Sequence, residues 1–183
     1  MSTPLCAAIA NRHMAATRLL LEHGADPSKL DRINRRPIYY ATINGDIGTI
    51  ELLIDHGASI HDAPVMFTAA LHDNISMVEW FLNNGADINS TDAINALKAA
   101  VGRDNPPMVK LLLDRGVDVN GVDGLTGTAL HMAVCTERVD MIRMLIDVGA
   151  ILKPSSKGKT PLYHAKKIAN ETIIKILEDA FGS

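Results

Sequence analysis

Aromatic residues are scarce in this chain of 183 residues, which contains one Trp, three Tyr and three Phe, or 4% in all. Hydrophobic residues nevertheless make up 47% and charged residues 21%, which are ordinary values for a globular protein and exclude a disordered chain. Alanine and leucine must therefore do most of the packing. Such small aliphatic side chains favour thin helices that lie close together.

Long apolar runs and a strong excess of one charge are also missing. No run approaches the roughly 20 residues of a membrane-spanning helix, and the first residues lack the charged and apolar leader of a secreted protein. A net charge of −3 and a pI of about 6.1 give no general attraction to nucleic acids or membranes. We expect a cytoplasmic protein, with the nucleus as the alternative, that binds neither nucleic acid nor membrane.

Sequence motifs for catalysis and for metal binding are missing as well. No Cys and His residues have the spacing of a zinc site, and there is no G-x-S-x-G nucleophile motif or pair of catalytic carboxylates. Gly158-Lys159-Thr160 matches the end of a phosphate-binding loop, but Lys153 stands where that pattern needs its first glycine. We expect no enzymatic activity, no bound metal and no cofactor.

What the sequence does contain is an internal repeat. A helix-like apolar run ends in a glycine five times, at intervals of 33, 28, 31 and 33 residues, at Gly24, Gly57, Gly85, Gly116 and Gly149. A second landmark opens each copy, as in Thr3-Pro4-Leu5-Cys6-Ala7-Ala8, and opens a sixth copy as Thr160-Pro161-Leu162-Tyr163-His164-Ala165. A period of this length predicts a stack of repeats rather than a single globular core.

The two landmarks resemble those of the ankyrin repeat, in which a T-P-L-H-x-A helix is followed by a helix that ends in L-L-x-x-G-A-D. The resemblance covers residues 3–181 and implies an all-α solenoid of about six helix-turn-helix repeats with short β-turn or hairpin connections. It predicts one domain over residues 1–183, with repeats at about 1–30, 31–60, 61–91, 92–122, 123–154 and 155–183. We expect this domain to be a monomer.

Single residues within the repeats carry local predictions. Thr before Pro predicts a capped helix start, and each closing glycine predicts a left-handed helix end. His131 stands at the family's T-P-L-H histidine, which implies a bond to turn backbone. Trp80 replaces a leucine of the family in the second helix of repeat 3. We expect Trp80 in the core, with a binding anchor beside Phe67 as the alternative.

Two turns in the middle of the array are shorter than the family pattern. The connection Ser59-Ile60-His61-Asp62-Ala63 is too short for a full hairpin, and a second shortened turn precedes Asn95. We expect the shortened turns to widen the groove there. Neutral loss of loop residues is the alternative interpretation.

In the ankyrin fold, the turns and the ends of the first helices line a concave groove that binds partner proteins. Carried onto this chain, the resemblance predicts a binding surface at Arg32, Ile33, Arg35, Tyr40, Ile43, Asn44, His61, His72, Arg103, Leu125, Lys157 and Lys159. Tyr39 and Tyr40 replace the family's H-x pair and predict an aromatic contact in repeat 2. Because the set is basic, we expect an adaptor or scaffold whose partner is an acidic protein.

A second function class stays open. The shortened turns of repeats 3 and 4 could instead form a cleft for a small molecule or for enzymatic chemistry, with His61, His72, Tyr39, Tyr40 or Arg103 as its polar groups. A solvated charged face that only keeps the array soluble is the alternative interpretation of the basic set, and a targeting module cut from a larger chain is the third possible function.

Overall fold

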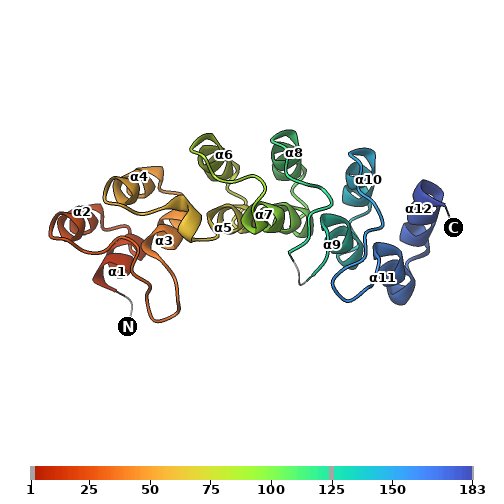
Figure 1. Cartoon of the computed structure of the whole chain (residues 1–183), viewed down its shortest axis with the longest axis horizontal. Helices are drawn as coiled ribbons and strands as arrows, with labels where there is room; N and C mark the ends of the chain where they lie inside the picture. Colours follow the sequence, from red (N-terminus) through yellow and green to blue (C-terminus); the bar gives the residue numbers. More distant parts are fainter. Residues whose placement is uncertain (1–2, 124–125, 183) are drawn as a thin grey trace. The chain divides into compact units, whose positions relative to one another are not determined.

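The structure is a computed structural model that describes residues 3–123 and 126–182. Over these residues it contains twelve α-helices and one short 3-10 helix and no β-strand (Figure 1). The chain divides into two compact units, Met1–Asp87 and Ile88–Ser183, called unit 1 and unit 2 below. The helices form six pairs, which follow the six predicted repeats and confirm an all-α repeat solenoid.

Unit 1 contains three helix pairs and the 3-10 helix. These elements are α1 (Pro4–Ala10), α2 (Met14–Glu22), α3 (Pro37–Asn44), α4 (Ile47–Asp55), η1 (Ile60–Asp62), α5 (Val65–Leu71) and α6 (Ile75–Asn83). The first helices of the pairs, α1, α3 and α5, stack side by side, and α2 lies against α4 (Figure 1).

Unit 2 contains the other three pairs. They are α7 (Thr91–Gly102) with α8 (Pro106–Asp114), α9 (Ala129–Cys135) with α10 (Val139–Asp147), and α11 (Pro161–Ile168) with α12 (Glu171–Phe181). Helices α7, α9 and α11 stack in order, and α10 lies against α12. Each unit therefore has the layout of a helical repeat stack, in which every repeat packs on its neighbours.

The helices begin and end where the local residues predict. The Thr3 hydroxyl accepts a hydrogen bond from the Cys6 N–H at 3.1 Å, and the Thr160 hydroxyl accepts one from the Tyr163 N–H at 3.2 Å. A proline follows each of these threonines in the first turn, where its missing N–H costs nothing. The glycines that close the second helices have φ angles between +80° and +96°, the left-handed conformation that a side chain disfavours.

Histidines at two of these helix ends have the same local role. A ring nitrogen of His23 lies 2.9 Å from the Leu19 carbonyl oxygen, and one of His56 lies 2.9 Å from the Leu52 carbonyl oxygen. Each histidine therefore satisfies a carbonyl in the last turn of its own helix.

The core of each unit lies between its two layers of helices. In unit 1 the largest fully buried side chains are Ile38, Ile50, Leu53, Met66, Met77 and Phe81, and in unit 2 they are Leu97, Met108, Leu112, Leu130, Met141 and Ile142. Alanines such as Ala41, Ala69 and Ala100 are completely buried and let the helices approach closely. Trp80 is only half-buried and meets the Phe81 ring edge to face at 5.4 Å. The core position predicted for Trp80 is therefore correct in part.

The two shortened turns have different structures. The first becomes the 3-10 helix η1, which the Ser59 hydroxyl caps by accepting the His61 N–H. The second is replaced by an extra helical turn, because α7 already starts at Thr91, where the Ser90 hydroxyl accepts the N–H of Ala93. Residues 91–94, which the family pattern places in the shortened turn before Asn95, are therefore helical, because Ser90 caps the helix earlier and no Pro or Gly interrupts it.

Candidate binding surface

The turn between α2 and α3, residues 26–36, projects as a finger that one carboxylate holds in shape. Asp31 is only 7% exposed, and one of its oxygens accepts the N–H groups of Ile33 at 2.9 Å and of Arg35 at 3.0 Å. The main chain closes the same turn, because the Asp31 N–H donates to the Arg35 carbonyl at 2.9 Å. The conformation of this finger is therefore fixed from within.

The second carboxylate oxygen of Asp31 anchors the finger to α3. It accepts the Tyr40 hydroxyl at 2.5 Å. This bond holds the pKa of Asp31 below its ordinary value, and burial together with the same bond raises the pKa of Tyr40 to about 12. Near neutral pH the pair therefore stays a carboxylate and a neutral phenol, and the anchor does not titrate.

Two arginines at the base of the finger have different partners. The Arg36 guanidinium donates to the Ser28 carbonyl at 2.5 Å, across the finger. The Arg35 guanidinium carbon lies 4.2 Å from the centre of the Tyr39 ring, which is a cation–π contact. Arg36 therefore supports the fold, whereas Arg35 is exposed and held in one orientation by Tyr39.

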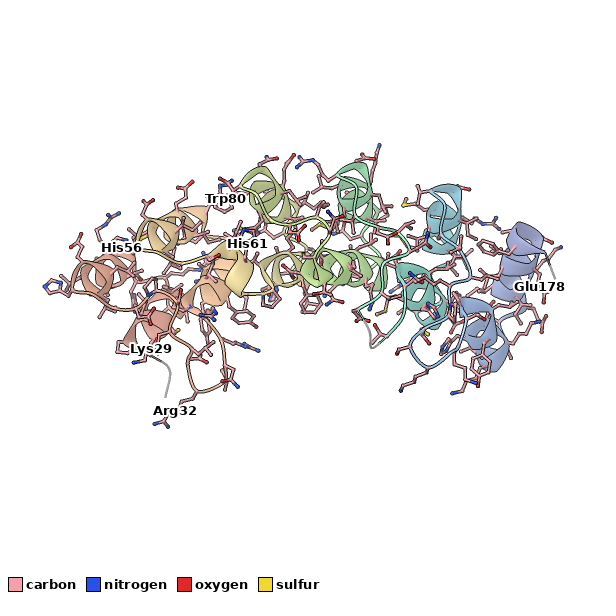
Figure 2. The ribbon with its side chains drawn as sticks, in the orientation of Figure 1. Lys29, Arg32, His56, His61, Trp80 and Glu178 are labelled. Carbon is pink, nitrogen blue, oxygen red and sulfur yellow. The ribbon has the colours of Figure 1, made fainter. Side chains whose placement is uncertain are left out.

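A hollow of about 240 Å³ lies beside this stacked pair. Its lining consists of Leu30, Ile33, Asn34, Arg35, Arg36 and Tyr39, together with Ala63 and Pro64 from the shortened turn. Ile33 is 63% exposed and Leu30 is 46% exposed at its rim. Exposed Arg32 lies at the tip of the finger and points away from the helices (Figure 2). We call Leu30, Arg32, Ile33, Arg35 and Tyr39 the finger surface.

The finger is cationic. Residues 26–36 contain four basic side chains and two carboxylates. Asp31 is turned inward as described, and Asp26 accepts the N–H of Ser28 at 2.8 Å. The positive charges of Arg32 and Arg35 are therefore presented to solvent beside exposed apolar carbon.

The structure brings together Arg32, Ile33 and Arg35 of the predicted set, but other members in unit 1 have internal roles or lie elsewhere. Tyr40 is half-buried and holds Asp31. The Asn44 amide donates to the Ile9 carbonyl at 2.7 Å, which joins repeat 2 to repeat 1. Half-buried Ile43 lies in α3, exposed His61 lies in η1, and exposed His72 caps the end of α5 beside the Thr68 carbonyl.

The predicted residues of unit 2 are separate from the finger surface in the chain and are described on their own. Arg103 is exposed at the end of α7, and Lys157 is exposed in the turn before α11. The Lys159 ammonium lies 4.1 Å from the centre of the Tyr163 ring. Leu125 lies outside the described residues. Arg35 and Lys159 occupy the same repeat position, four residues before a tyrosine that the cation covers.

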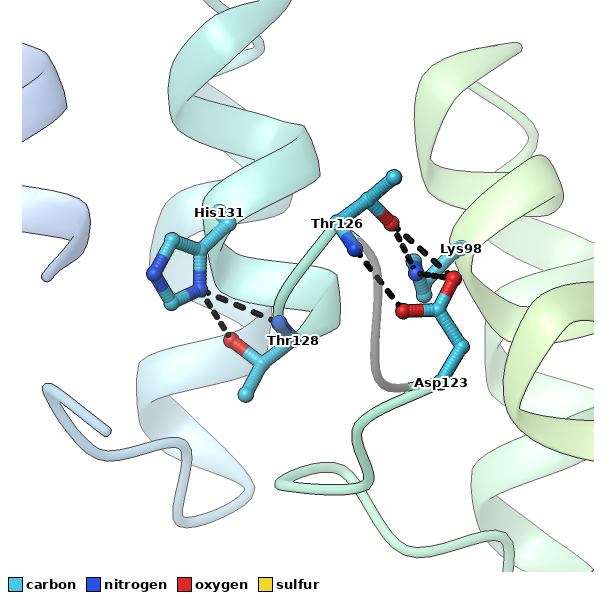
Figure 3. Close-up of polar contacts among 5 residues, drawn as sticks. All are labelled: Lys98, Asp123, Thr126, Thr128 and His131. Atoms are coloured by element: carbon cyan, nitrogen blue, oxygen red, sulfur yellow. Dashed lines mark hydrogen bonds and ion pairs between the residues drawn. The ribbon is translucent and has the colours of Figure 1, made fainter. Parts of the chain in front are cut away.

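Sequence reasoning missed a buried ion pair in unit 2 (Figure 3). Lys98 is 4% exposed, and its ammonium lies 2.6 Å from the Asp123 carboxylate and is also bonded to the Thr126 hydroxyl. Asp123 in turn accepts the Thr126 N–H at 2.9 Å. Lys98 occupies in repeat 4 the position that His131 occupies in repeat 5. The alignment of the repeats could therefore have indicated that Lys98 also bonds to a turn.

His131 makes the turn contacts that its position implies. Its Nδ1 accepts the Thr128 N–H at 3.0 Å (Figure 3). Its Nε2 therefore carries the proton and donates to the Lys159 carbonyl at 2.8 Å. A β-carbon on Gly127 would lie 2.7 Å from this ring, at a φ of +88°. Lys98 and His131 thus each connect the first helix of a repeat to the turn that leads into the next repeat.

The bonds of His131 predict a pH dependence of stability. Burial lowers the pKa of His131 below its ordinary value of 6.5, and His164 and Lys98 act in the same direction. Protonation would also place a second N–H against the Thr128 N–H. Because the unfolded chain binds this proton more tightly, the stabilisation is present above about pH 6.5 and is lost as the pH falls through the lowered pKa.

We therefore expect the unfolding free energy of His131→Asn to fall less between about pH 7.5 and about pH 5 than that of the wild type. Urea titrations at a series of pH values measure this slope. His13→Asn, at an exposed histidine, is the matched control and should keep the wild-type slope. Identical slopes for His131→Asn and the wild type would contradict a lowered pKa of His131 in the folded protein.

The described residues show neither a membrane-crossing helix nor a metal-binding cluster. No helix in residues 3–123 and 126–182 is long and apolar enough to cross a membrane. Over the same ranges, no three side chains of His, Cys, Asp or Glu are placed together so that they could hold a metal ion.

Comparison with known proteins identifies the family. A family model described as "Ankyrin repeats (3 copies)" matches residues 65–155 and 97–181, and one described as "Ankyrin repeats (many copies)" matches residues 5–64. The chain belongs to the ankyrin-repeat family. Ankyrin repeats generally mediate protein–protein interaction, and the family is typically not enzymatic.

Curated relatives resemble parts of this ankyrin chain. Human ankyrin repeat and SOCS box protein 2 is 37% identical over 94 residues, which are 47% of this chain and 14% of that protein. Cyclin-dependent kinase 4 inhibitor B of Bos taurus is 41% identical over 70 residues, 38% of this chain and 53% of that protein. The L-asparaginase of Dirofilaria immitis is 28% identical over 180 residues, 93% of this chain but only 30% of the enzyme. The chain thus spans less than two thirds of each relative.

Solved ankyrin domains share the fold along nearly the whole chain. The ankyrin repeat domain of Bcl-3 superposes with a TM-score of 0.75 at 28% identity, covering 96% of this chain and 82% of that one. An ankyrin repeat domain of Acinetobacter baumannii AYE gives 0.72 at 27% identity and covers 97% of both chains.

Proposed function

We propose that this ankyrin protein binds a partner protein through the finger surface, and that the partner presents an apolar side chain flanked by carboxylates. The observation that supports this is the arrangement around the hollow. Exposed Ile33 and Leu30 adjoin the Arg35–Tyr39 stack, on a finger that Asp31 holds in place.

The arrangement has the physical properties of a recognition site. Contiguous exposed apolar patches on a monomeric surface often mark binding sites, and Leu30 and Ile33 line the same hollow. The ring of Tyr39 orders the Arg35 guanidinium before a partner binds, so less side-chain entropy is lost when a carboxylate binds this guanidinium. A guanidinium offers two parallel N–H donors that match both oxygens of a carboxylate.

The small-molecule alternative has weaker support. The hollow measures about 240 Å³, below the roughly 300–1,000 Å³ of typical ligand pockets. Of the five polar groups expected for chemistry, only Tyr39 is among its lining residues, so these groups do not converge there. An open rim with arginines and aliphatic side chains fits a protein segment better.

The proposal can be tested by selecting ligands from a displayed peptide library on the wild-type protein. We expect the enriched peptides to carry Asp or Glu next to an apolar residue. Binding of the selected peptide should weaken about 10- to 100-fold in Arg32→Glu/Arg35→Glu, because two charge-assisted contacts become repulsive.

The matched control is Lys110→Glu/Arg143→Glu, which reverses the same number of charges at exposed positions on α8 and α10. This control should bind the peptide as the wild type does. Enriched peptides without acidic residues, or equal losses in the two double variants, would refute the proposed site.

A further inference from the structure

The sequence contains three Asn-Gly pairs, Asn44-Gly45, Asn84-Gly85 and Asn120-Gly121. Such a pair can deamidate without an enzyme, because glycine has no side chain that keeps its backbone nitrogen away from the asparagine amide. The glycine nitrogen attacks the asparagine Cγ, ammonia leaves and a cyclic imide forms. Water then opens the imide to aspartate or isoaspartate. The fold determines which of the three pairs can reach the geometry of this attack.

Two of the three asparagine side chains are held by bonds to a neighbouring repeat. The Asn44 amide donates to the Ile9 carbonyl at 2.7 Å. The Asn120 amide uses both of its groups, because its N–H donates to the Gly149 carbonyl at 3.0 Å and its oxygen accepts the Ile151 N–H at 2.9 Å. Both side chains are half-buried. Attack on either amide carbon would therefore have to break contacts between repeats.

Asn84 is held only by a bond within its own helix. It is exposed at the end of α6, and its amide donates to the Trp80 carbonyl at 2.8 Å. His23 and His56 stand at the same repeat position and bond to the carbonyl four residues back in the same way. Opening the last turn of α6 is enough to release Asn84, and helix ends open locally at a low free energy.

The three glycine nitrogens are also held to different degrees. The nitrogen of Gly121 lies 2.9 Å and that of Gly45 lies 3.1 Å from the carbonyl oxygen to which it donates. The nitrogen of Gly85 lies 3.4 Å from the Leu82 oxygen, which is longer than an ordinary N–H···O bond. Gly85 therefore has the attacking nitrogen that is most easily released.

The space around the glycines differs in the same order. A β-carbon on Gly121 would lie 2.7 Å from Ile94, and one on Gly45 would lie 3.0 Å from the Asn74 amide nitrogen. Around Gly85, no heavy atom of the described residues comes within 4 Å of such a carbon, its neighbours in the chain aside. The imide ring adds atoms beside the glycine backbone, so the crowding at the first two pairs opposes the reaction.

We propose that Asn84-Gly85 is the site at which the folded chain deamidates, and that the reaction loosens the end of α6. The Asn84 backbone rotates away from its ψ of +22° as the helix end opens, which lets the Gly85 nitrogen reach Cγ. A bond forms between this nitrogen and Cγ, and the bond from Cγ to Nδ2 breaks. The proton from Gly85 leaves with the amide group as ammonia, and hydrolysis of the imide consumes one water molecule.

The product is a carboxylate in place of an amide. It has lost the N–H donor that bonds to the Trp80 carbonyl. It also places a negative charge at the C-terminal end of α6, where the helix dipole disfavours it. The isoaspartate form adds a carbon to the main chain at this point. Each change weakens the last turn of the helix that contains Trp80 and the buried Phe81.

Incubation of the folded wild type at mildly alkaline pH, followed by peptide mapping with mass spectrometry, tests the site. We expect deamidation at Asn84 to be at least about tenfold faster than at Asn44 or Asn120. In urea the three pairs should react at similar rates, which shows that the fold causes the difference. Equal rates in the folded protein would overturn the proposal. So would a folded chain in which Asn84 stays intact while the unfolded chain reacts.

Two variants test the effect on α6. Asn84→Asp has the carboxylate of the product, so the amides in the last turn of α6 should exchange their hydrogens about two- to fivefold faster than in the wild type. Asn84→His carries the side chain that repeats 1 and 2 have at this position. It should neither deamidate there nor exchange faster. Wild-type exchange in Asn84→Asp would show that deamidation does not loosen the helix.

Discussion

Asp123→Ala is expected to lower the free energy of unfolding by about 3–5 kcal/mol, because it leaves the buried ammonium of Lys98 without its carboxylate. Lys98 is 4% exposed and lies 2.6 Å from Asp123, so water cannot readily replace the lost partner. The turn loses a second contact, since Asp123 also accepts the Thr126 N–H. Urea unfolding followed by circular dichroism measures the difference.

A second substitution separates the ion pair from simple loss of packing. Lys98→Met removes the charge and keeps most of the side-chain volume, so Lys98→Met/Asp123→Ala should recover much of the stability that Asp123→Ala loses. A double variant no more stable than Asp123→Ala would show that the unpaired charge is not the cause. An Asp123→Ala loss below about 1 kcal/mol would show that Lys98 is solvated in solution.

Phe81→Ala is also expected to lower the free energy of unfolding by about 3–5 kcal/mol. The substitution loses the free energy gained when the ring moves from water into the core, and the cavity that it leaves adds a further cost. Phe81 is completely buried in α6 of unit 1. The chain has one tryptophan, Trp80, whose ring centre lies 5.4 Å from that of Phe81. Tryptophan fluorescence during urea unfolding therefore reports on this repeat directly.

Leu71→Ala is the matched control for Phe81→Ala. Leu71 is 41% exposed in α5, so its truncation should cost below about 1 kcal/mol. If Phe81→Ala and Leu71→Ala lower the stability equally, the burial assigned to Phe81 is wrong. An unchanged fluorescence spectrum of folded Phe81→Ala would contradict its contact with Trp80.

The features that were predictable from the sequence depend on neighbours in the chain. The caps at Thr3 and Thr160 need only the next few residues, and so do the left-handed glycines such as Gly57. The repeat pattern then determines which helices pair, because each repeat buries its apolar side on the next one. The fold could therefore be predicted from the sequence almost completely.

The site was less predictable, because its residues depend on distant partners. Tyr40 and Asn44 both matched the family's groove positions, yet Asp31 binds the first and Ile9 binds the second. Position alone cannot tell whether a polar side chain will find a partner within the fold. Of the two tyrosines predicted to make an aromatic contact in repeat 2, Tyr39 is the one whose ring packs against the Arg35 guanidinium.

The start of α7 shows the same limit for a helix boundary. The family pattern places a turn before Asn95, but Ser90 can cap a helix one turn earlier. Both choices satisfy local rules, and only the packed structure decides between them. Lys98, which follows in α7, reaches Asp123 in a turn 25 residues away, a contact that no local rule indicates.

The finger surface is proposed to bind a protein segment through Arg32 and Arg35. Calorimetric titration of the selected acidic peptide into the wild type and into Arg32→Glu/Arg35→Glu, each at low and high salt, tests it most directly. We predict that salt weakens wild-type binding, and that the double variant binds about 10- to 100-fold more weakly and loses this salt dependence. Equal affinity and equal salt dependence in the two proteins would contradict the claim.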